Sequence, residues 1–521
     1  MKQRVCAMLL CAALLLTLLS GCASKKTEGE SLAEQEQTVL PTEEETSVEE
    51  SAGPVGIAWQ SDSDLHPYTS TSVTNQAILS LLYEGLFIVT SDFTAEALLC
   101  NYCAVSEAGY VWYFEIRDDV KFSDGTQMTS ADVVASLNAA WESPVYKLRF
   151  RCINAIEARG DYGVVVRLNY TNENLPMLLD LPIVKTATID SPNPIGSGPY
   201  AVQGDTLVRN SRWWYTGGHV LTADTIQLIE ANDALAVRNA FEFGGADLAY
   251  VDTSATTMSA YHSDNERWGC STTVMEYLGF NQFGNYFFSA ELRAAITYAI
   301  DRSTIVADIY DGFGVEASLP CAPQAIFYDN GLADGYAFHL ADFQSLMTAS
   351  GISPDPADPI RLIVSANNDR RVETANFIAA QLNELGLFTE VEALKPDVFR
   401  NRLYMNDFDL YLADIRLSPT LDLDGFFYSG SGCCYGGMES ESMRELCRDA
   451  MENSGSYYDL HREVMRRGMM CPIFFKSYAL YVTRGIIGSH TPSVSNLFVT
   501  GTGIPVADIM SDEVYVDEPA E

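Results

Sequence analysis

Strand and helix patterns alternate between residues 360 and 415, and this alternation limits the possible folds more than any other feature of the chain. The apolar runs and turn signals predict, in order, a strand at 360–366, a helix at about 370–385, a strand at 388–394, a helix at 397–406 and a strand at 409–415. Gly386 marks the end of the first of these helices. A chain that alternates in this way packs helices against a sheet, so the sequence predicts an α/β fold.

The apolar spacings typical of strands and of helices also occur earlier in the chain. They predict strands at 55–60, 111–117 and 163–170, and helices at 75–87, 129–141 and 289–310. The helix at 129 opens with Thr129-Ser130-Ala131-Asp132, which resembles a capping box. At 521 residues and 47% hydrophobic content, the chain is long enough for two or three domains.

The N-terminus combines a basic start, a short apolar run and a cysteine. Lys2 and Arg4 precede residues 8–19, a stretch too short to span a bilayer and typical of a signal-peptide core. Leu19-Ser20-Gly21-Cys22 follows and resembles the lipobox of bacterial lipoproteins. The resemblance implies a signal peptide at 1–21, a diacylglycerol on the Cys22 sulfur, and a place on the extracytoplasmic face of the cell membrane. The alternative is an ordinary secretory signal with an incidental cysteine.

Residues 23–53 are acidic and lack aromatic side chains. They contain nine Glu and two Lys. Such a segment buries too little apolar area to offset its ordering entropy, so residues 22–53 are expected to form the lipidated Cys and a disordered acidic tether. The net charge of the whole chain is -38, which argues against a nucleic acid as a partner.

The cysteines outside the signal peptide and Cys22 number nine, an odd count that cannot pair completely within one chain. We expect buried free thiols, with one or two disulfides as the alternative. Cys100 and Cys103 form a CxxC pair, but neither a second CxxC nor a nearby His supports a zinc or redox site.

No sequence motif argues for an enzyme. The chain contains no HExxH, no Walker loop, no GxGxxG after a strand and no GxSxG elbow. The six histidines are scattered along the chain. The sequence therefore predicts no catalytic residue, no metal site and no cofactor.

Seven stretches, in this order, resemble the peptide/nickel family of bacterial extracellular solute-binding proteins, the receptors of ABC importers. They are "DLHPY" (64–68), "LLYEGLF" (81–87), "YVWYFEIRDDVKFSDGTQMTSADVVASL" (110–137), "IGSGPY" (195–200), "FEFGGADLAYV" (241–251), "YLGFNQF" (277–283) and "ELRAAITYAIDRSTIV" (291–306). The resemblance runs from about residue 55 to 500.

These motifs also have an architectural interpretation. Gly196 and Gly198, before Pro199, suit a tight backbone crossing between the lobes. Arg293 and Arg302 are expected to hold helix ends or to pair with acids such as Asp301.

The resemblance implies a two-lobed, type II periplasmic-binding-protein-like α/β fold in its large cluster C form. Two chain crossings would join the lobes, with the ligand enclosed between them. The expected bounds are 54–87, 188–272 and 484–521 for lobe I, 88–187 for a subdomain inserted in it, and 273–483 for lobe II.

The segment 408–427, "FDLYLADIRLSPTLDLDGFF", departs from the peptide-binding pattern of the family. Relatives that bind peptides carry a Trp after this strand and then an acid for the peptide amine. Here Arg416 stands near the Trp position and Ser418 close to the acid, while Asp422 or Asp424 could replace the Asp of an Asp-Pro pair. Arg416 could hold a carboxylate or phosphate, or pair with Asp414, Asp422 or Asp424.

Aromatic side chains add further candidates for the cleft. The candidate ligand-binding residues are Arg416, Ser418, Asp422, Asp424, Tyr435, Trp59 and Tyr83. Trp213 and Trp214 are interpreted as core residues.

The function expected from the resemblance is that of a monomeric, lipid-anchored receptor. It would capture an oligopeptide or similar small solute and deliver it to ABC permease subunits with cytoplasmic ATPases. A sensor or signalling lipoprotein on the same scaffold, and more remotely a surface hydrolase, are the alternatives.

Overall fold

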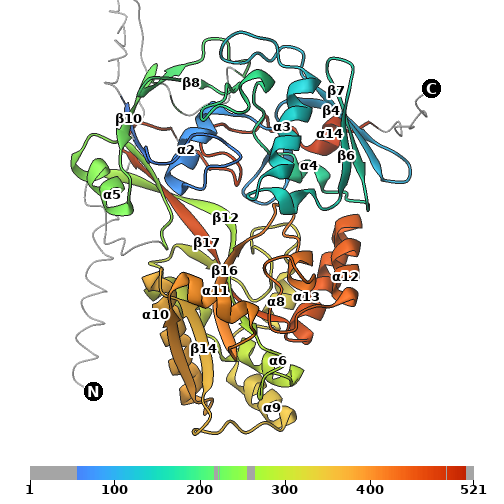
Figure 1. The fold of residues 1–521 in the computed structure, drawn as a ribbon, viewed down its shortest axis with the longest axis vertical. Coiled ribbons are helices and arrows are strands. Elements are labelled where there is room, and N and C mark those ends of the chain that lie inside the picture. The colour runs from blue at the N-terminus through green and yellow to red at the C-terminus, as the bar shows by residue number, and fades with distance from the viewer. Residues whose placement is uncertain (1–54, 216–220, 222, 255–263, 489, 512–521) are drawn as a thin grey trace, which may run out of the picture. The chain divides into compact units, whose positions relative to one another are not determined.

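The structure is a computed structural model that describes residues 55–215, 221, 223–254, 264–488 and 490–511. The expected signal peptide, Cys22 and the acidic tether lie outside the described residues. The described part belongs to one compact unit, residues 52–521, and its fold is mixed α/β as predicted (Figure 1).

One large sheet runs through this unit. Its strands, in spatial order, are β15 (Thr389–Leu394), β14 (Ile360–Ser365), β16 (Leu410–Arg416), β12 (Asn265–Phe280), β17 (Met470–Thr483), β11 (Leu248–Val251), β1 (Val55–Trp59), β10 (Thr225–Glu230), β9 (Thr206–Arg209) and β8 (Tyr200–Gln203), with β13 (Gly314–Glu316) beside β17. The strands β14, β15 and β16 form the sheet of a second lobe, and β1, β10 and β11 that of a first lobe. The two-lobed architecture predicted from the sequence is confirmed.

The long strands β12 and β17 join the two lobes (Figure 1). The register of β12 against β17 shifts between Ser271 and Met275, and β12 pairs with β16 only from Val274 on. The predicted lobe boundary after residue 272 falls within this irregular stretch. β17 pairs with β11 of the first lobe from Ala479 on, a few residues before the second predicted boundary at 483–484. Both lobe boundaries stay predictions.

A smaller sheet stands on the first lobe. It contains β4 (Cys100–Val105), β5 (Val111–Ile116), β7 (Gly163–Leu168) and β6 (Ile153–Arg159) in that order, and β2 (Phe87–Val89) pairs with β3 (Ala95–Ala97) beside it. We call residues 88–187, which contain this sheet, the subdomain.

The helices cover the sheets and their connections. The longer ones are α2 (Val73–Leu82), α3 (Ser130–Glu142), α5 (Ala234–Phe243), α6 (Ala290–Ala299), α9 (Leu340–Ser350), α10 (Asp369–Glu384), α11 (Pro396–Tyr404), α12 (Glu441–Glu452) and α13 (Tyr457–Arg466). The short ones are α4 (Leu175–Leu178), α7 (Arg302–Thr304), α8 (Asn330–Asp334), α14 (Val506–Ile509), the π-helix η3 (Ile305–Ile309) and the 3₁₀ turns η1 (Lys147–Phe150), η2 (Thr186–Thr188), η4 (Asp424–Phe427) and η5 (Ser454–Ser456).

Two predicted helices are shorter than expected. The helix expected at 75–87 is α2, which ends at Leu82 because Tyr83 is extended. The helix expected at 289–310 breaks after α6. Ile300 is extended there, and the Asp301 side chain accepts a hydrogen bond from the Thr304 N–H to cap α7.

The glycine and arginine motifs are architectural, as predicted, but the glycines do not mark a crossing between the lobes. A Cβ atom on Gly196 would lie 2.1 Å from the carbonyl oxygen of Leu82, which belongs to the first lobe as Gly196 does, so only glycine fits this contact. Arg293 donates to the Gly468 carbonyl at 2.9 Å, and Arg302 donates to the Pro472 carbonyl at 2.8 Å. Both arginines therefore hold backbone carbonyl groups of the second lobe.

All nine cysteines of the described chain are free thiols. Burial raises the pKa of Cys103 and of Cys152 to about 11. The alternative of one or two disulfides is not found.

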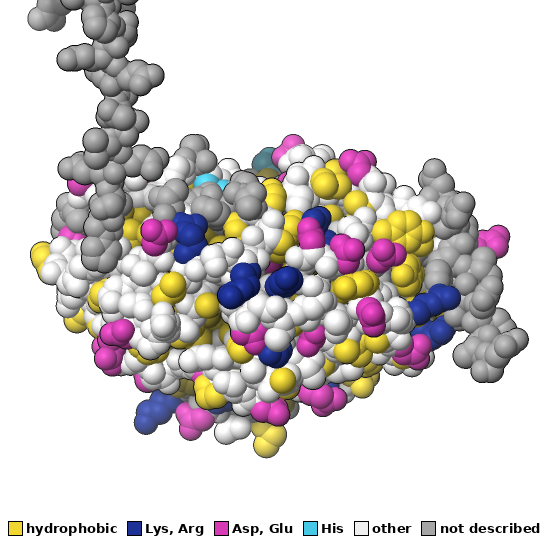
Figure 2. Space-filling view, turned by 90° about the horizontal axis from the view of Figure 1, so that it is seen from above, with side chains coloured by type: hydrophobic (Ala, Val, Ile, Leu, Met, Phe, Trp, Pro, Cys, Tyr) yellow, Lys and Arg dark blue, Asp and Glu magenta, His cyan; other side chains and the backbone are white. Residues whose placement is uncertain are grey.

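Charged side chains are dispersed on the face seen in Figure 2. Acidic groups lie among neutral and apolar ones, with a few basic groups between them, and no extended patch of one sign is visible there.

Candidate ligand-binding cleft

A cavity of about 240 Å³ lies where the two lobes meet. It is smaller than the roughly 300–1,000 Å³ of pockets that bury drug-sized ligands, so it suits a small solute. The first lobe contributes α2 and Val494–Leu497 to its walls, and the subdomain forms a further part. The strands that join the lobes and Arg416–Pro419 of the second lobe complete the lining.

Arg416 ends β16 and lies in the wall of this cleft. Its Nη2 donates a hydrogen bond to the Tyr478 hydroxyl at 3.4 Å. Within the described chain, no carboxylate lies within 4.0 Å of the Arg416 guanidinium. The expected alternative, a pair with Asp414, Asp422 or Asp424, is not formed, because Lys476 and Arg371 occupy Asp414 while Arg151 and Arg444 occupy Asp424.

Tyrosines form the floor of the cleft beside Arg416. The rings of Tyr250 and Tyr478 meet edge to face with centroids 5.8 Å apart. Burial raises the pKa of both phenols and that of Tyr146, so all three are neutral at physiological pH. The floor is therefore apolar with neutral hydroxyl groups.

One ion pair also lies in the cleft wall. Arg149 binds the Asp180 carboxylate, whose side chain is 6% exposed. This pair joins two parts of the subdomain.

Ser418 and Tyr83 also line the cleft. Their hydroxyl groups already have partners. Ser418 Oγ accepts from the Asp422 N–H at 3.3 Å, and the Tyr83 hydroxyl lies 3.0 Å from the carbonyl oxygens of Leu65 and Pro194.

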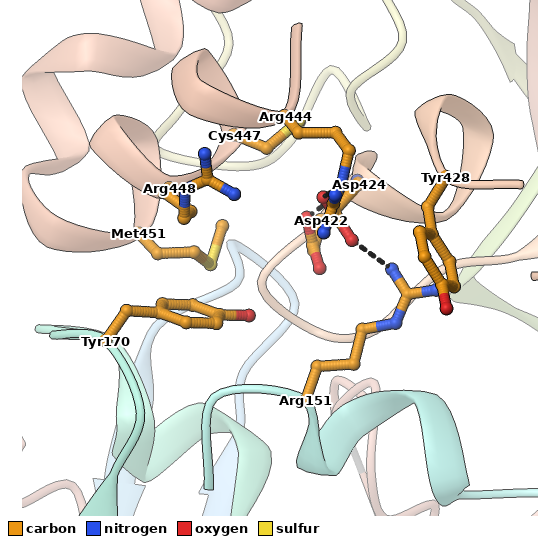
Figure 3. Close-up of a pocket in the computed structure, with 9 residues that line it drawn as sticks. All are labelled: Arg151, Tyr170, Asp422, Asp424, Tyr428, Arg444, Cys447, Arg448 and Met451. Carbon is orange, nitrogen blue, oxygen red and sulfur yellow. Dashed lines mark hydrogen bonds and ion pairs between the residues drawn. The ribbon is translucent and has the colours of Figure 1, made fainter. Parts of the chain in front are cut away.

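A second cavity, of about 270 Å³, lies between the subdomain and the second lobe (Figure 3). The Tyr170 hydroxyl and the Asp422 carboxylate point toward its middle. Burial raises the pKa of Asp422 to about 6, although its carboxylate accepts the Asp424 N–H at 2.9 Å.

Asp424 joins the subdomain to the second lobe. Its carboxylate binds Arg151 of the subdomain at 2.6 Å and Arg444 of α12 at 2.9 Å. The Tyr428 ring faces both guanidinium groups, 5.8 Å from Arg151 and 4.9 Å from Arg444. The Asp424 side chain is only 12% exposed, so this bridge is shielded from solvent.

The two remaining candidates lie elsewhere. Trp59 packs against the core of the first lobe with its indole N–H buried and unpaired. Tyr435 packs against Tyr404 and Tyr411, and its hydroxyl donates to the Gly432 carbonyl. Neither side chain lines the two cavities.

We expect Arg151→Gln to weaken the contact between the subdomain and the second lobe by about 1.5–3 kcal/mol, the usual range for a hydrogen bond to a charged group. The lobes should then part more readily, and small-angle X-ray scattering should show a larger radius of gyration. Arg149→Gln is the matched control, because it breaks an ion pair inside the subdomain. Equal radii for the two variants would contradict the bridging role.

A charge cluster consists of Glu276 on β12, Lys476 on β17, Asp414 on β16 and Arg371 on α10, so it ties the joining strands to the second lobe. Lys476 is 2% exposed and its Nζ lies 2.6 Å from Asp414 and 3.9 Å from Glu276. Arg371 of α10 binds the same two carboxylates. Lys476 also donates to Ser254 Oγ at 2.9 Å, three residues after the end of β11, so the cluster connects the two lobes.

Tyr250, Tyr478 and the charge cluster were not predicted from the sequence. The signal that could have found the cluster is Lys476 itself, a lysine inside the apolar strand "CPIFFKSYALYV" (471–482). A lysine is rarely buried without a charged partner. Tyr250 and Tyr478 carried no such signal, because tyrosine is common in ordinary strands.

Within the residues that the structure describes, no group of three or more His, Cys, Asp or Glu residues is placed to hold a metal ion. Nor does that part of the chain contain a helix of the length and apolarity that crossing a membrane requires.

The family model "bacterial extracellular solute-binding proteins, family 5 Middle" matches residues 94–437. The oligopeptide-binding protein AppA of Bacillus subtilis is 22% identical over 423 residues, covering 73% of this chain and 77% of AppA. The glutathione-binding protein GsiB of Escherichia coli is 22% identical over 366 residues, covering 63% of this chain and 67% of GsiB.

Solved structures share the fold. The ABC transporter substrate-binding protein CtaP of Listeria monocytogenes superposes with a TM-score of 0.72 at 19% identity, covering 86% of this chain and all of CtaP. AppA of B. subtilis in complex with a nonapeptide gives a TM-score of 0.60 at 19% identity and covers 85% of this chain and 97% of that one.

Proposed function

The chain belongs to family 5 of the bacterial extracellular solute-binding proteins, and on this premise we propose that it is a lipid-anchored receptor for an ABC importer. It captures an oligopeptide or similar small solute between its lobes and delivers it to the permease subunits, whose cytoplasmic ATPases drive import. It acts as a monomer on the extracytoplasmic face of the cell membrane and catalyses no reaction.

The observation that carries this proposal is the cleft itself. Both lobes and both joining strands contribute to one cavity, so a bound solute would contact both lobes at once. A ligand that contacts both lobes stabilises the closed state, and closure would signal occupancy to the permease.

The ligand class follows from the relatives and from the cavity. AppA and GsiB are described as oligopeptide- and glutathione-binding proteins, so peptides and their derivatives are the first candidates. The cavity of about 240 Å³ favours a short one. Among the residues predicted from the sequence, Arg416, Ser418 and Tyr83 are proposed as cleft contacts, and Asp422 and Asp424 as residues of the second cavity.

The anchor is proposed from the N-terminal sequence. Cys22 would carry the lipid, and the acidic stretch 23–53 would hold the receptor away from the bilayer surface. A solute captured outside the cell would then stay near the importer.

The test is uptake of an isotopically labelled tripeptide mixture by cells that lack this chain. We expect uptake to fall and the wild-type chain to restore it. Cys22→Ser should appear in the medium, whereas Cys11→Ser, which changes a cysteine of the signal-peptide core, should stay with the membrane fraction. Unchanged uptake in cells that lack the chain, and again in cells that lack the permease, would favour a sensor role over import.

A further inference from the structure

The charges in the cleft wall are unbalanced. Apart from tyrosines, the ionisable residues that line it are Arg149, Asp180 and Arg416. Arg149 and Asp180 neutralise each other. Arg416 is left as a cation that donates a hydrogen bond to the neutral Tyr478 hydroxyl.

This excess of positive charge in the cleft wall contrasts with the acidic composition of the whole protein. The chain has 70 acidic and 32 basic residues, so an arginine chosen at random would have many carboxylates to pair with. The other arginines near the two cavities do so: Arg149 binds Asp180, Arg151 and Arg444 bind Asp424, and Arg448 binds Glu441. Arg416 is the cation that the cleft leaves for a ligand.

The position of Arg416 suits recognition of an oxyanion. Its planar guanidinium offers parallel N–H donors that match a carboxylate or a phosphate. The phenol rings of Tyr250 and Tyr478 lie beside it and hold no charge that would compete. Arg416 itself is exposed to solvent, so closure of the lobes over a solute would have to exclude that water before an ion pair here became stronger than one on an open surface.

The same wall offers nothing comparable to an amine. The only carboxylate that lines it among the described residues is Asp180, which is bound to Arg149 and almost fully buried. Asp422 and Asp424 lie in the second cavity instead. A ligand ammonium group in the cleft would therefore meet Arg416 without a counter-charge.

We infer that this cleft selects its solute through an oxyanion, a carboxylate or phosphate held by Arg416, and that it does not require a free amine. The inference rests on the proposed receptor function and names the ligand class of that same cleft. Peptides with a blocked or modified amino terminus, small organic acids and sugar phosphates share the required group.

The test is retention of solute mixtures by the purified full chain, read by mass spectrometry after gel filtration. A random tripeptide library is offered unmodified, N-acetylated and C-terminally amidated, together with a pool of di- and tricarboxylic acids and a pool of sugar phosphates. We expect solutes with a free acid to be retained, N-acetylated peptides included, and amidated peptides with neutral side chains to be lost. Retention from the carboxylate mixtures or from the phosphate pool tells which oxyanion the cleft takes.

Three variants then test whether Arg416 is the residue that binds the solute. Arg416→Gln should weaken binding of the retained solute about 10- to 100-fold, as expected for the loss of a charge-assisted hydrogen bond. Arg416→Lys should keep part of the affinity, and Arg484→Gln, which changes an exposed arginine outside the cleft, should keep all of it. Wild-type binding should also weaken as salt rises.

Two results would overturn the inference. Retention of neutral, amidated peptides with equal affinity for wild type and Arg416→Gln would refute the oxyanion preference and leave the receptor function intact. Retention of no solute by the wild-type protein in any arm would contradict the receptor function, and the oxyanion preference with it.

Discussion

Lys476→Met is expected to lower the free energy of unfolding by about 3–5 kcal/mol, the cost of removing one partner from a buried ion pair. After this change, Arg371 is the one cation of the cluster that still pairs with both Glu276 and Asp414. Glu276 is fully buried, so water does not replace the lost lysine. Burial alone would raise the pKa of Asp414, but Lys476 and Arg371 outweigh it and hold that pKa below its usual value. Urea denaturation at neutral pH measures the loss.

Two further variants make this prediction specific. Lys185→Met breaks a single, partly exposed pair with Asp124 and should cost no more than about 1 kcal/mol. Adding Glu276→Gln to Lys476→Met removes one anion along with the cation, so the double variant should recover part of the loss. If Lys476→Met lost no more stability than Lys185→Met, the cluster would not support the joining strands.

The wild-type protein should lose stability below pH 6.5 partly because of His461. This side chain is fully buried in α13, and neither ring nitrogen has a hydrogen-bond partner. Burial lowers the pKa of His461 to about 3. In the unfolded chain His461 binds a proton near pH 6.5, whereas in the folded chain it stays neutral down to about pH 3. Lowering the pH through this window therefore favours the unfolded state.

His461→Leu removes this linkage. Between pH 7 and pH 4.5 the wild type should lose about 2.5 kcal/mol more than the variant does, from a single group with these two pKa values. His339→Leu changes an exposed imidazole and is the control. Parallel stability curves for the wild type and His461→Leu would show that His461 is hydrated or protonated in the folded protein.

Local signals explain which elements could be predicted from the sequence. The predicted capping residue Asp132 accepts the Thr129 N–H at 3.1 Å, and Gly386, with φ of 82°, follows the end of α10. The break between α6 and α7 could not be predicted in the same way. The apolar period continues through it, and only the tertiary contacts of Arg302 and the cap at Asp301 show that the backbone turns there.

The candidate site was predictable only in part for a related reason. Arg416 and Ser418 lie on one segment whose departure from the family pattern is visible in the sequence, and both line the cleft. Asp424 lies in the same segment, but its partner Arg151 is 273 positions away. Such pairs arise from the fold, so the sequence could not separate a ligand contact from a bridge between lobes.

Native mass spectrometry of the protein as purified tests the receptor function most directly. We predict an adduct with the mass of one small solute, whose removal lowers the melting temperature and whose return restores it. A solute at 100 times its dissociation constant should add about 2.7 kcal/mol of stability. The bare chain mass in every preparation, with a melting temperature that no peptide, organic acid or sugar phosphate shifts, would contradict the account.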